Sequence, residues 1–223
     1  MPRRCAIFVW LLAMLAFWLA SGATAQEAAA DKWEKEIAAL EAKDKESPPP
    51  RDGIVFIGSS SIRRWDLKKS FPELPAINRG FGGSQLADSV KYVPRIVVPY
   101  RPKTVVLYAG DNDIPAGKSP QQIADDFAAF VKAVRSQLPE TKIIFLAIKP
   151  SPSRWKFYEE QQTANRMVRE QCGAGKNLVF VDLVTPMLGG DGMPREELFV
   201  KDQLHLSDAG YALWAKVLAP HLK

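Results

Sequence analysis

The chain has few of the residues that build disulfide frameworks or metal centres. Its 223 residues include two cysteines, Cys5 and Cys172, and two histidines, His205 and His221. So few cysteines exclude a disulfide framework and a cysteine-based zinc site, and so few histidines disfavour a histidine-rich metal centre. We therefore expect no metal site. Cys172 has no histidine nearby in the sequence, so we expect a buried, unreactive thiol.

Excess charge of one sign is also missing. The net charge is +5, and it falls to +3 if the first 25 residues, which contain two arginines and no acidic residue, are removed. No basic run is interleaved with aromatic residues, so we expect no nucleic-acid partner. With 47% hydrophobic and 25% charged residues, the composition excludes disordered, collagen-like and coiled-coil chains. The length suits one domain after a targeting segment.

Residues 1–25 have the layout of a secretory signal peptide. Two arginines precede an apolar run at residues 5–20, and Ala-Thr-Ala at 23–25 is a small-residue cleavage site. The apolar run is shorter than the ~20 residues that span a bilayer, which disfavours an uncleaved anchor. We expect cleavage before Gln26, export to the periplasm or the cell exterior, and no membrane span in the mature protein.

The rest of the chain is predicted to be a short N-terminal segment followed by one α/β domain. Residues 26–50 combine a helical pattern with a proline-rich linker, and residues 51–223 form the core domain. In the core, short apolar runs alternate with amphipathic stretches, which predicts a parallel sheet with helices on both faces. The predicted strands are 53–58, 77–79, 103–108, 142–148 and 177–181, and the predicted helices are 84–98, 120–137, 156–172 and 208–221.

Two segments that follow predicted strands are rich in glycine or serine. Gly58-Ser59-Ser60-Ser61 can present a hydroxyl at the sheet edge, although a serine-rich turn that caps a helix is commoner. Ile62 stands where the G-x-S-x-G elbow needs its last glycine, which disfavours an ordinary α/β-hydrolase. The glycines of residues 78–84 allow close approach of a ligand. A dinucleotide loop is disfavoured, because Gln85 replaces the glycine it requires.

Two further segments carry polar side chains suited to acyl transfer. Gly110-Asp111-Asn112-Asp113 follows the third strand, where an asparagine amide can donate to an oxyanion, although a plain Asx-turn is the simpler interpretation. Asp202 and His205 lie three residues apart just before the last helix. There the carboxylate can accept from one ring nitrogen and leave the other as a base.

The four segments in this order resemble the SGNH hydrolases, also called the GDSL esterase/lipase family, over about residues 53–221. The resemblance implies Ser60 as the nucleophile, Asp202 and His205 as its triad partners, and Ser60, Gly83 and Asn112 as the oxyanion hole. Ser59 replaces the family's aspartate, so Ser59 and Ser61 stay open as alternative nucleophiles. The branch most similar to this chain contains the platelet-activating-factor acetylhydrolase subunits. It implies a flavodoxin-like αβα sandwich with a five-stranded parallel sheet.

These observations predict a secreted serine esterase that needs no cofactor and acts on a small ester, such as a carbohydrate or cell-envelope acetyl ester. The alternatives are a lipase or lysophospholipase, and a catalytically silent binding protein on the same fold. Arg154 and Trp155, after the fourth strand, are candidate substrate contacts, although a rigid proline loop with a packed tryptophan explains them equally well. Other side chains near the site by sequence are Asp111, Asp113 and Arg79, as possible supports, and Trp65, which we expect to pack.

Overall fold

The computed structural model describes residues 32–223, and the chain divides into two compact units, residues 1–39 and 40–223. The predicted signal peptide at 1–25 lies outside the described residues, as does the start of the predicted N-terminal helix. Helix α2 (Glu34–Glu46) is the described part of that helix. Within residues 32–223, no helix combines the length and hydropathy that crossing a membrane requires.

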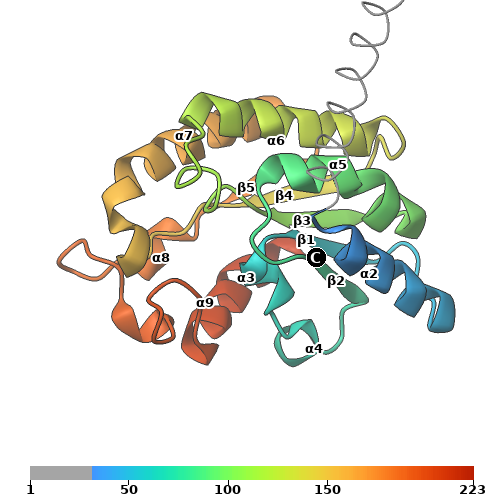
Figure 1. Cartoon of the computed structure of the whole chain (residues 1–223), viewed down its shortest axis with the longest axis horizontal. Helices are drawn as coiled ribbons and strands as arrows, with labels where there is room; N and C mark the ends of the chain where they lie inside the picture. The colour runs from blue at the N-terminus through green and yellow to red at the C-terminus, as the bar shows by residue number, and fades with distance from the viewer. Residues whose placement is uncertain (1–31) are drawn as a thin grey trace, which may run out of the picture. The chain divides into compact units, whose positions relative to one another are not determined.

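The second unit is built on the predicted five-stranded parallel sheet (Figure 1). The spatial order is β2-β1-β3-β4-β5. The first strand, β1, therefore has β2 on one side, and β3, β4 and β5 follow in order on the other side. Every position of β1 and β3 is buried, as continuous apolar runs predict for strands covered on both faces. The strands are β1 (Ile54–Gly58), β2 (Ala76–Gly80), β3 (Thr104–Tyr108), β4 (Lys142–Leu146) and β5 (Leu178–Val181).

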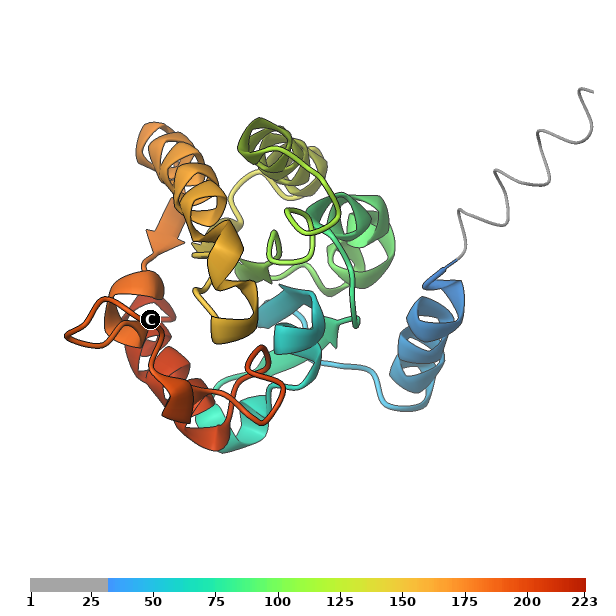
Figure 2. The same cartoon turned by 60° about the vertical axis from the view of Figure 1, so that its left-hand side comes forward.

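Helices cover both faces of the sheet, which gives the predicted three layers (Figures 1 and 2). On one face α5 (Leu86–Ile96), α6 (Pro120–Arg135) and α7 (Tyr158–Ala174) pack side by side. The other face carries α9 (Asp208–Leu218) with the short helices that follow β1. The remaining elements are α3 (Ser60–Arg63), α4 (Leu67–Ser70), α8 (Val184–Met187) and the 3₁₀ turns Val98–Tyr100, Pro152–Phe157, Glu196–Leu198 and Ala219–His221.

An aromatic cluster fills the layer between the sheet and α9. The Trp214 ring lies 4.8 Å from the Tyr108 ring and 5.6 Å from the Trp65 ring. Trp65 is buried and packs, as the sequence predicted. This cluster fixes α9, and with it the turn that precedes α9, against the carboxyl end of the sheet. On the opposite face, Phe127 of α6 packs on Phe145 of β4 at 5.2 Å.

The junction between β1 and α3 requires a glycine. Gly58 has φ +139°, and a Cβ on it would lie 1.9 Å from the carbonyl oxygen of Tyr108. No other residue allows β1 to approach β3 this closely and then turn sharply. The chain enters α3 at once, which places Ser60 in its first turn at the edge of the sheet.

The last helix begins directly after the predicted Asp-x-x-His segment. Ser207 caps α9, its hydroxyl accepting a hydrogen bond of 3.2 Å from the backbone N–H of Gly210. The same hydroxyl donates to the carbonyl of Glu197 at 2.7 Å. The start of the helix is therefore fixed two residues after His205.

Candidate active site

Three side chains form a hydrogen-bonded row at the carboxyl ends of the strands. Ser60 Oγ lies 3.0 Å from His205 Nε2, and His205 Nδ1 lies 2.6 Å from Asp202 Oδ2. Ser60 lies on α3, whereas Asp202 and His205 lie on the turn before α9. His205 is 145 residues away from Ser60 in the sequence. The Nδ1–carboxylate contact leaves Nε2 free to accept the serine proton, which is the geometry of a general base and its nucleophile.

The three adjacent serines differ in where their hydroxyls lie. Ser60 is half-buried and contacts the His205 ring. Ser59 is fully buried, and its hydroxyl donates to Asp111 Oδ1 at 3.4 Å. Ser61 is also buried, and its Oγ has no hydrogen-bond partner in the described structure. Only Ser60 meets the imidazole.

Asp202 is held by three donors on its own turn. Its Oδ1 accepts from the backbone N–H groups of Leu204 and His205, both at 2.9 Å, while Oδ2 faces the imidazole. Burial raises the pKa of this carboxyl, but the hydrogen bonds from the His205 ring and the two N–H groups outweigh it, and the net pKa lies well below its usual range. Asp202 therefore stays charged and keeps the ring oriented.

Three hydrogen-bond donors surround the space in front of Ser60. The backbone N–H groups of Ser60 and Gly83 have no hydrogen-bond partner among residues 32–223, and Gly83 adopts φ +73° with open space around it. Asn112 Nδ2 donates to the carbonyl of Ser84 at 2.9 Å, and its second hydrogen is available to a ligand. The predicted oxyanion residues thus line one pocket with Ser60.

Arg154 fixes the orientation of the Asn112 amide. One guanidinium nitrogen lies 2.9 Å from Asn112 Oδ1, and another donates to the carbonyl of Asp111. Because Asn112 Oδ1 accepts a hydrogen bond from the Arg154 guanidinium, the Asn112 Nδ2 group faces Ser84 and the pocket. Trp155, the other candidate substrate contact, instead stacks on Tyr158 at 4.3 Å and is not among the residues that line this pocket.

A buried ion pair supports the floor of the site. Lys149 Nζ lies 2.9 Å from Asp111 Oδ2 and 3.1 Å from the Tyr108 hydroxyl, and its side chain is 1% exposed. Burial raises the pKa of Asp111, but the charges of Lys149 and Arg154 outweigh it and lower the pKa overall. Sequence reasoning assigned no role to Lys149. The available signal was a lysine directly after a buried apolar strand, where a charge needs a partner.

The other two candidate supports have different partners. Asp113 is fully buried and accepts from the backbone N–H of Leu86 at 3.1 Å and from Lys118 at 3.2 Å, which ties the loop after β3 to the start of α5. Arg79 donates to the Tyr100 hydroxyl at 3.0 Å and pairs with Asp44 at 2.5 Å. Arg79 therefore anchors the end of α2, within the second unit, and not the row of Ser60.

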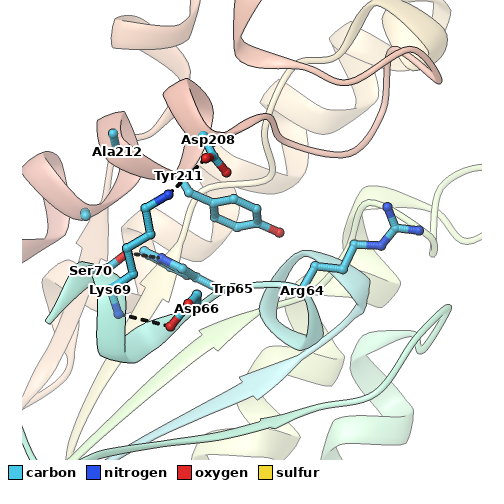
Figure 3. Close-up of a pocket in the computed structure, with 9 residues that line it drawn as sticks. Arg64, Trp65, Asp66, Lys69, Ser70, Asp208, Tyr211 and Ala212 are labelled. Carbon is cyan, nitrogen blue, oxygen red and sulfur yellow. Dashed lines mark hydrogen bonds and ion pairs between the residues drawn. The ribbon is translucent and has the colours of Figure 1, made fainter. Parts of the chain in front are cut away.

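The pocket around Ser60 has a volume of about 590 Å³. Its lining is mostly polar, and it consists of Ser60, Arg63, Arg64, Gly82, Gly83, Asn112, Arg154, Leu204 and His205. A second pocket of about 350 Å³ lies between Trp65, Lys69 and α9 and shares only Arg64 with the first (Figure 3).

Two further features of the described residues bear on the site: the arrangement of possible metal ligands, and the cysteine Cys172. Within residues 32–223, no group of three or more histidine, cysteine or acidic side chains is arranged to hold a metal ion. Cys172 is buried on α7, as predicted, and burial raises the pKa of its thiol to about 12. The thiol is therefore protonated at neutral pH and a poor nucleophile.

Comparison with protein families gives one match that covers most of the chain. The model of the GDSL-like Lipase/Acylhydrolase family matches residues 58–213, from the end of β1 into α9. The platelet-activating factor acetylhydrolase IB subunit alpha2 of Rattus norvegicus is 26% identical over 194 residues, which cover 80% of this chain and 77% of the relative. The human protein of the same name aligns equally well.

Solved structures show the same fold. A Streptococcus pneumonia protein proposed to be a platelet activating factor superposes with a TM-score of 0.77 at 24% identity, covering 92% of this chain and 99% of its own. A variant of Axe2, an acetyl-xylooligosaccharide esterase from Geobacillus Stearmophilus, gives a TM-score of 0.56 at 17% identity over 78% of this chain and 95% of its own. The predicted αβα fold with a five-stranded parallel sheet is confirmed.

The Lys149–Asp111 pair should contribute more to stability than an exposed pair. Lys149→Met leaves a buried carboxylate without its main partner, which we expect to lower the free energy of unfolding by about 3–5 kcal/mol. Because the pKa of Asp111 is lowered by folding, the stabilisation is present above the unfolded pKa of about 3.9 and is lost as the pH falls through the folded value. Urea unfolding at pH 7 and at pH 3, which lies below the unfolded pKa, should therefore show a smaller difference between variant and wild type in acid.

The matched control is Lys69→Met, because Lys69 and Asp208 form an ion pair at 2.9 Å whose side chains are 67% and 90% exposed. This variant should lose far less stability than Lys149→Met, because water already screens the exposed pair. Adding Asp111→Asn to Lys149→Met removes the unpaired charge and should recover part of the loss. Equal losses for the two single lysine variants at pH 7 would show that the buried pair has no special role.

Proposed function

The chain belongs to the GDSL-like lipase/acylhydrolase family and is a hydrolase that acts on ester bonds, and we propose that Ser60, His205 and Asp202 are its catalytic triad. The observation that carries the proposal is the unbroken row from Ser60 Oγ through the imidazole to Asp202, with contacts of 3.0 and 2.6 Å. A silent binding protein has no need for a serine, an imidazole and a charged carboxylate in this order at a pocket.

Acylation begins when Ser60 Oγ attacks the ester carbonyl carbon and its proton passes to His205 Nε2. The imidazolium that forms is stabilised by Asp202, whose low pKa keeps it charged throughout. The tetrahedral oxyanion accepts hydrogen bonds from the N–H groups of Ser60 and Gly83 and from Asn112 Nδ2. As the intermediate collapses, His205 returns the proton to the leaving alcohol oxygen.

Deacylation repeats these steps with water in place of Ser60. His205 Nε2 accepts a proton from the water that attacks the acyl-enzyme, and as the intermediate collapses and the bond to Ser60 Oγ breaks, His205 returns that proton to Ser60 Oγ. The products are the carboxylic acid and the free enzyme.

The acyl group of the proposed substrate is small. Leu204 is the only aliphatic side chain among those that line the pocket, so a long acyl chain would meet no continuous aliphatic wall. The names of two similar proteins, an acetylhydrolase and an acetyl-xylooligosaccharide esterase, both refer to acetyl groups. We favour an acetyl ester of a carbohydrate or envelope component over a lipid or lysophospholipid.

The serine variants test the nucleophile. Ser60→Ala should lower kcat for p-nitrophenyl acetate by about 10⁴–10⁶, because nucleophile and base act as one unit. Ser61→Ala, which alters a buried hydroxyl without a partner, should retain most of the turnover. Ser59→Ala removes only the 3.4 Å contact to Asp111 and should have an intermediate, much smaller effect than Ser60→Ala. Near-full turnover in Ser60→Ala, with loss in either neighbour, would reassign the nucleophile.

A series of acyl chain lengths separates an acetyl esterase from a lipase. We expect kcat/KM to fall from p-nitrophenyl acetate to butyrate and to become very small for octanoate, because Leu204 is the only aliphatic side chain that lines the pocket. The rates are measured by release of nitrophenol below the micellar concentration of each ester. Activity that rises with chain length would favour the lipase alternative.

We also propose that residues 1–25 direct export, on the basis of their basic start, apolar run and Ala-Thr-Ala site. Expressed with its full sequence in a bacterial host, the mature protein should be released with the periplasmic or extracellular fraction and begin at Gln26. Fractionation and N-terminal sequencing measure both. Ala25→Arg, which puts a large charged residue at the cleavage site, should leave the signal attached. An intact Met1 on wild-type cytosolic protein would contradict the proposal.

A further inference from the structure

We propose that the natural substrate carries a carboxylate or phosphate group close to the scissile ester bond, and that Arg64 binds this anion. The inference rests on the proposed function and names the class of ester that the same site selects. The observation behind it is the charge of the pocket, which is lined by three arginines, Arg63, Arg64 and Arg154, and by no acidic side chain.

Arg64 is placed on the same side of its turn as the nucleophile. Its backbone N–H donates to the Ser60 carbonyl at 3.0 Å, so the two residues are one helical turn apart. Side chains at positions i and i+4 lie on one face of a helix, with their Cβ atoms about 5–6 Å apart. The guanidinium can therefore reach a substituent of an ester whose carbonyl is bound at Ser60 Oγ.

The charge of Arg64 is not neutralised by the protein. Two carboxylates lie nearby in the second pocket, but Asp66 accepts from the backbone of Lys69 at 3.0 Å, and Asp208 pairs with the Lys69 ammonium at 2.9 Å. Arg64 itself forms no ion pair with any residue of the described part of the chain. Figure 3 shows its side chain extending away from the Lys69–Asp208 pair. This arginine is exposed, and it lies where a ligand could use it.

The floor of the pocket adds positive charge. Asp111 pairs there with two cations, Lys149 at 2.9 Å and Arg154 at 3.5 Å. The other carboxylate of the site, Asp202, contacts the His205 ring and forms no ion pair with a lysine or arginine of the described residues. The group of Lys149, Arg154 and Asp111 therefore carries one net positive charge beside the oxyanion donors. In a partly buried site, an excess charge of this kind favours an anionic ligand and disfavours a cationic one.

Arg63 also lines the pocket, but it has other interactions within the protein, so the inference does not depend on it. Arg154 holds Asn112 and Asp111, so its replacement would disturb the oxyanion hole itself. Arg64 is the arginine whose removal changes the charge of the pocket without breaking a described hydrogen bond of its side chain.

The test compares acetate esters that differ only in charge. The first pair is 3-acetoxybenzoate and its neutral methyl ester, and the second is 3-acetoxyphenyl phosphate and its dimethyl ester. The meta position keeps the anion from assisting its own hydrolysis. The readout is the ratio of kcat/KM for the charged ester to that for its neutral partner, measured by release of the phenol. The two pairs distinguish a carboxylate ligand from a phosphate ligand.

The wild-type enzyme should prefer the charged ester of at least one pair by about fivefold or more, since a charge-assisted hydrogen bond is stronger than a neutral one. Arg64→Gln should bring that ratio close to one, and Arg64→Lys should retain part of it. Arg166→Gln, which removes an equal charge from an exposed site on α7 that lines neither pocket, should keep the wild-type ratio. Added salt should lower the wild-type ratio more than that of Arg64→Gln.

A wild-type ratio at or below one in both pairs, or a ratio that Arg64→Gln leaves unchanged, would overturn the inference. Either result leaves the proposed function standing if the neutral esters are hydrolysed and Ser60→Ala abolishes that hydrolysis. If no ester of either pair is hydrolysed in a Ser60-dependent way, the proposed function fails and the inference fails with it. Thermal melting of each Arg64 variant shows that it is folded.

Discussion

The contact between Ser60 and His205 depends on strands that end at a common edge. Gly58 pairs with Gly80 of β2 and with Tyr108 of β3, so the loops after these strands begin at the same level. The turn before α9 reaches this edge because Trp214 holds that helix against Tyr108. Residues that are far apart in the chain can therefore meet within 3.0 Å.

Buried charge is the second constraint on the site. Placing Lys149 and Asp111 under the pocket costs solvation, which their close contact and the hydrogen bonds to Tyr108 and Arg154 offset. The loop after β3 is held at Asp111 by Lys149, at Asn112 by Arg154, and at Asp113 by the backbone N–H of Leu86 and by Lys118. Asn112 lies between these anchors, so its amide is oriented before any substrate arrives. An oxyanion donor that needs no reorientation is the kind that accelerates acyl transfer.

The features that sequence alone could predict are those set by local pattern. Buried strands are continuous apolar runs, and Asp202 and His205 are three residues apart, so both follow from neighbouring residues. The choice among three serines could not be made in this way, because it depends on which hydroxyl faces a ring 145 residues away. The same holds for Lys149, whose partner lies 38 residues earlier, and for Arg79, whose partner Asp44 is on another element. A polar pair between residues far apart in the chain produces no periodic pattern that could be recognised in the sequence.

In the proposed reaction the row of Ser60, His205 and Asp202 carries out the chemistry, and we infer that the charges around it select the ester. Arg154 is committed to the Asn112 and Asp111 oxygens, and its positive charge stands behind the amide that meets the developing oxyanion. An anionic substituent bound at Arg154 would compete with that oxyanion for the same charge. Arg64 directly follows the helix that carries Ser60 and has no carboxylate partner in the described structure, so it can hold an anionic substituent apart from the oxyanion. Under this proposal, two arginines on separate elements let one pocket bind a charged substrate and still stabilise the charge of its transition state.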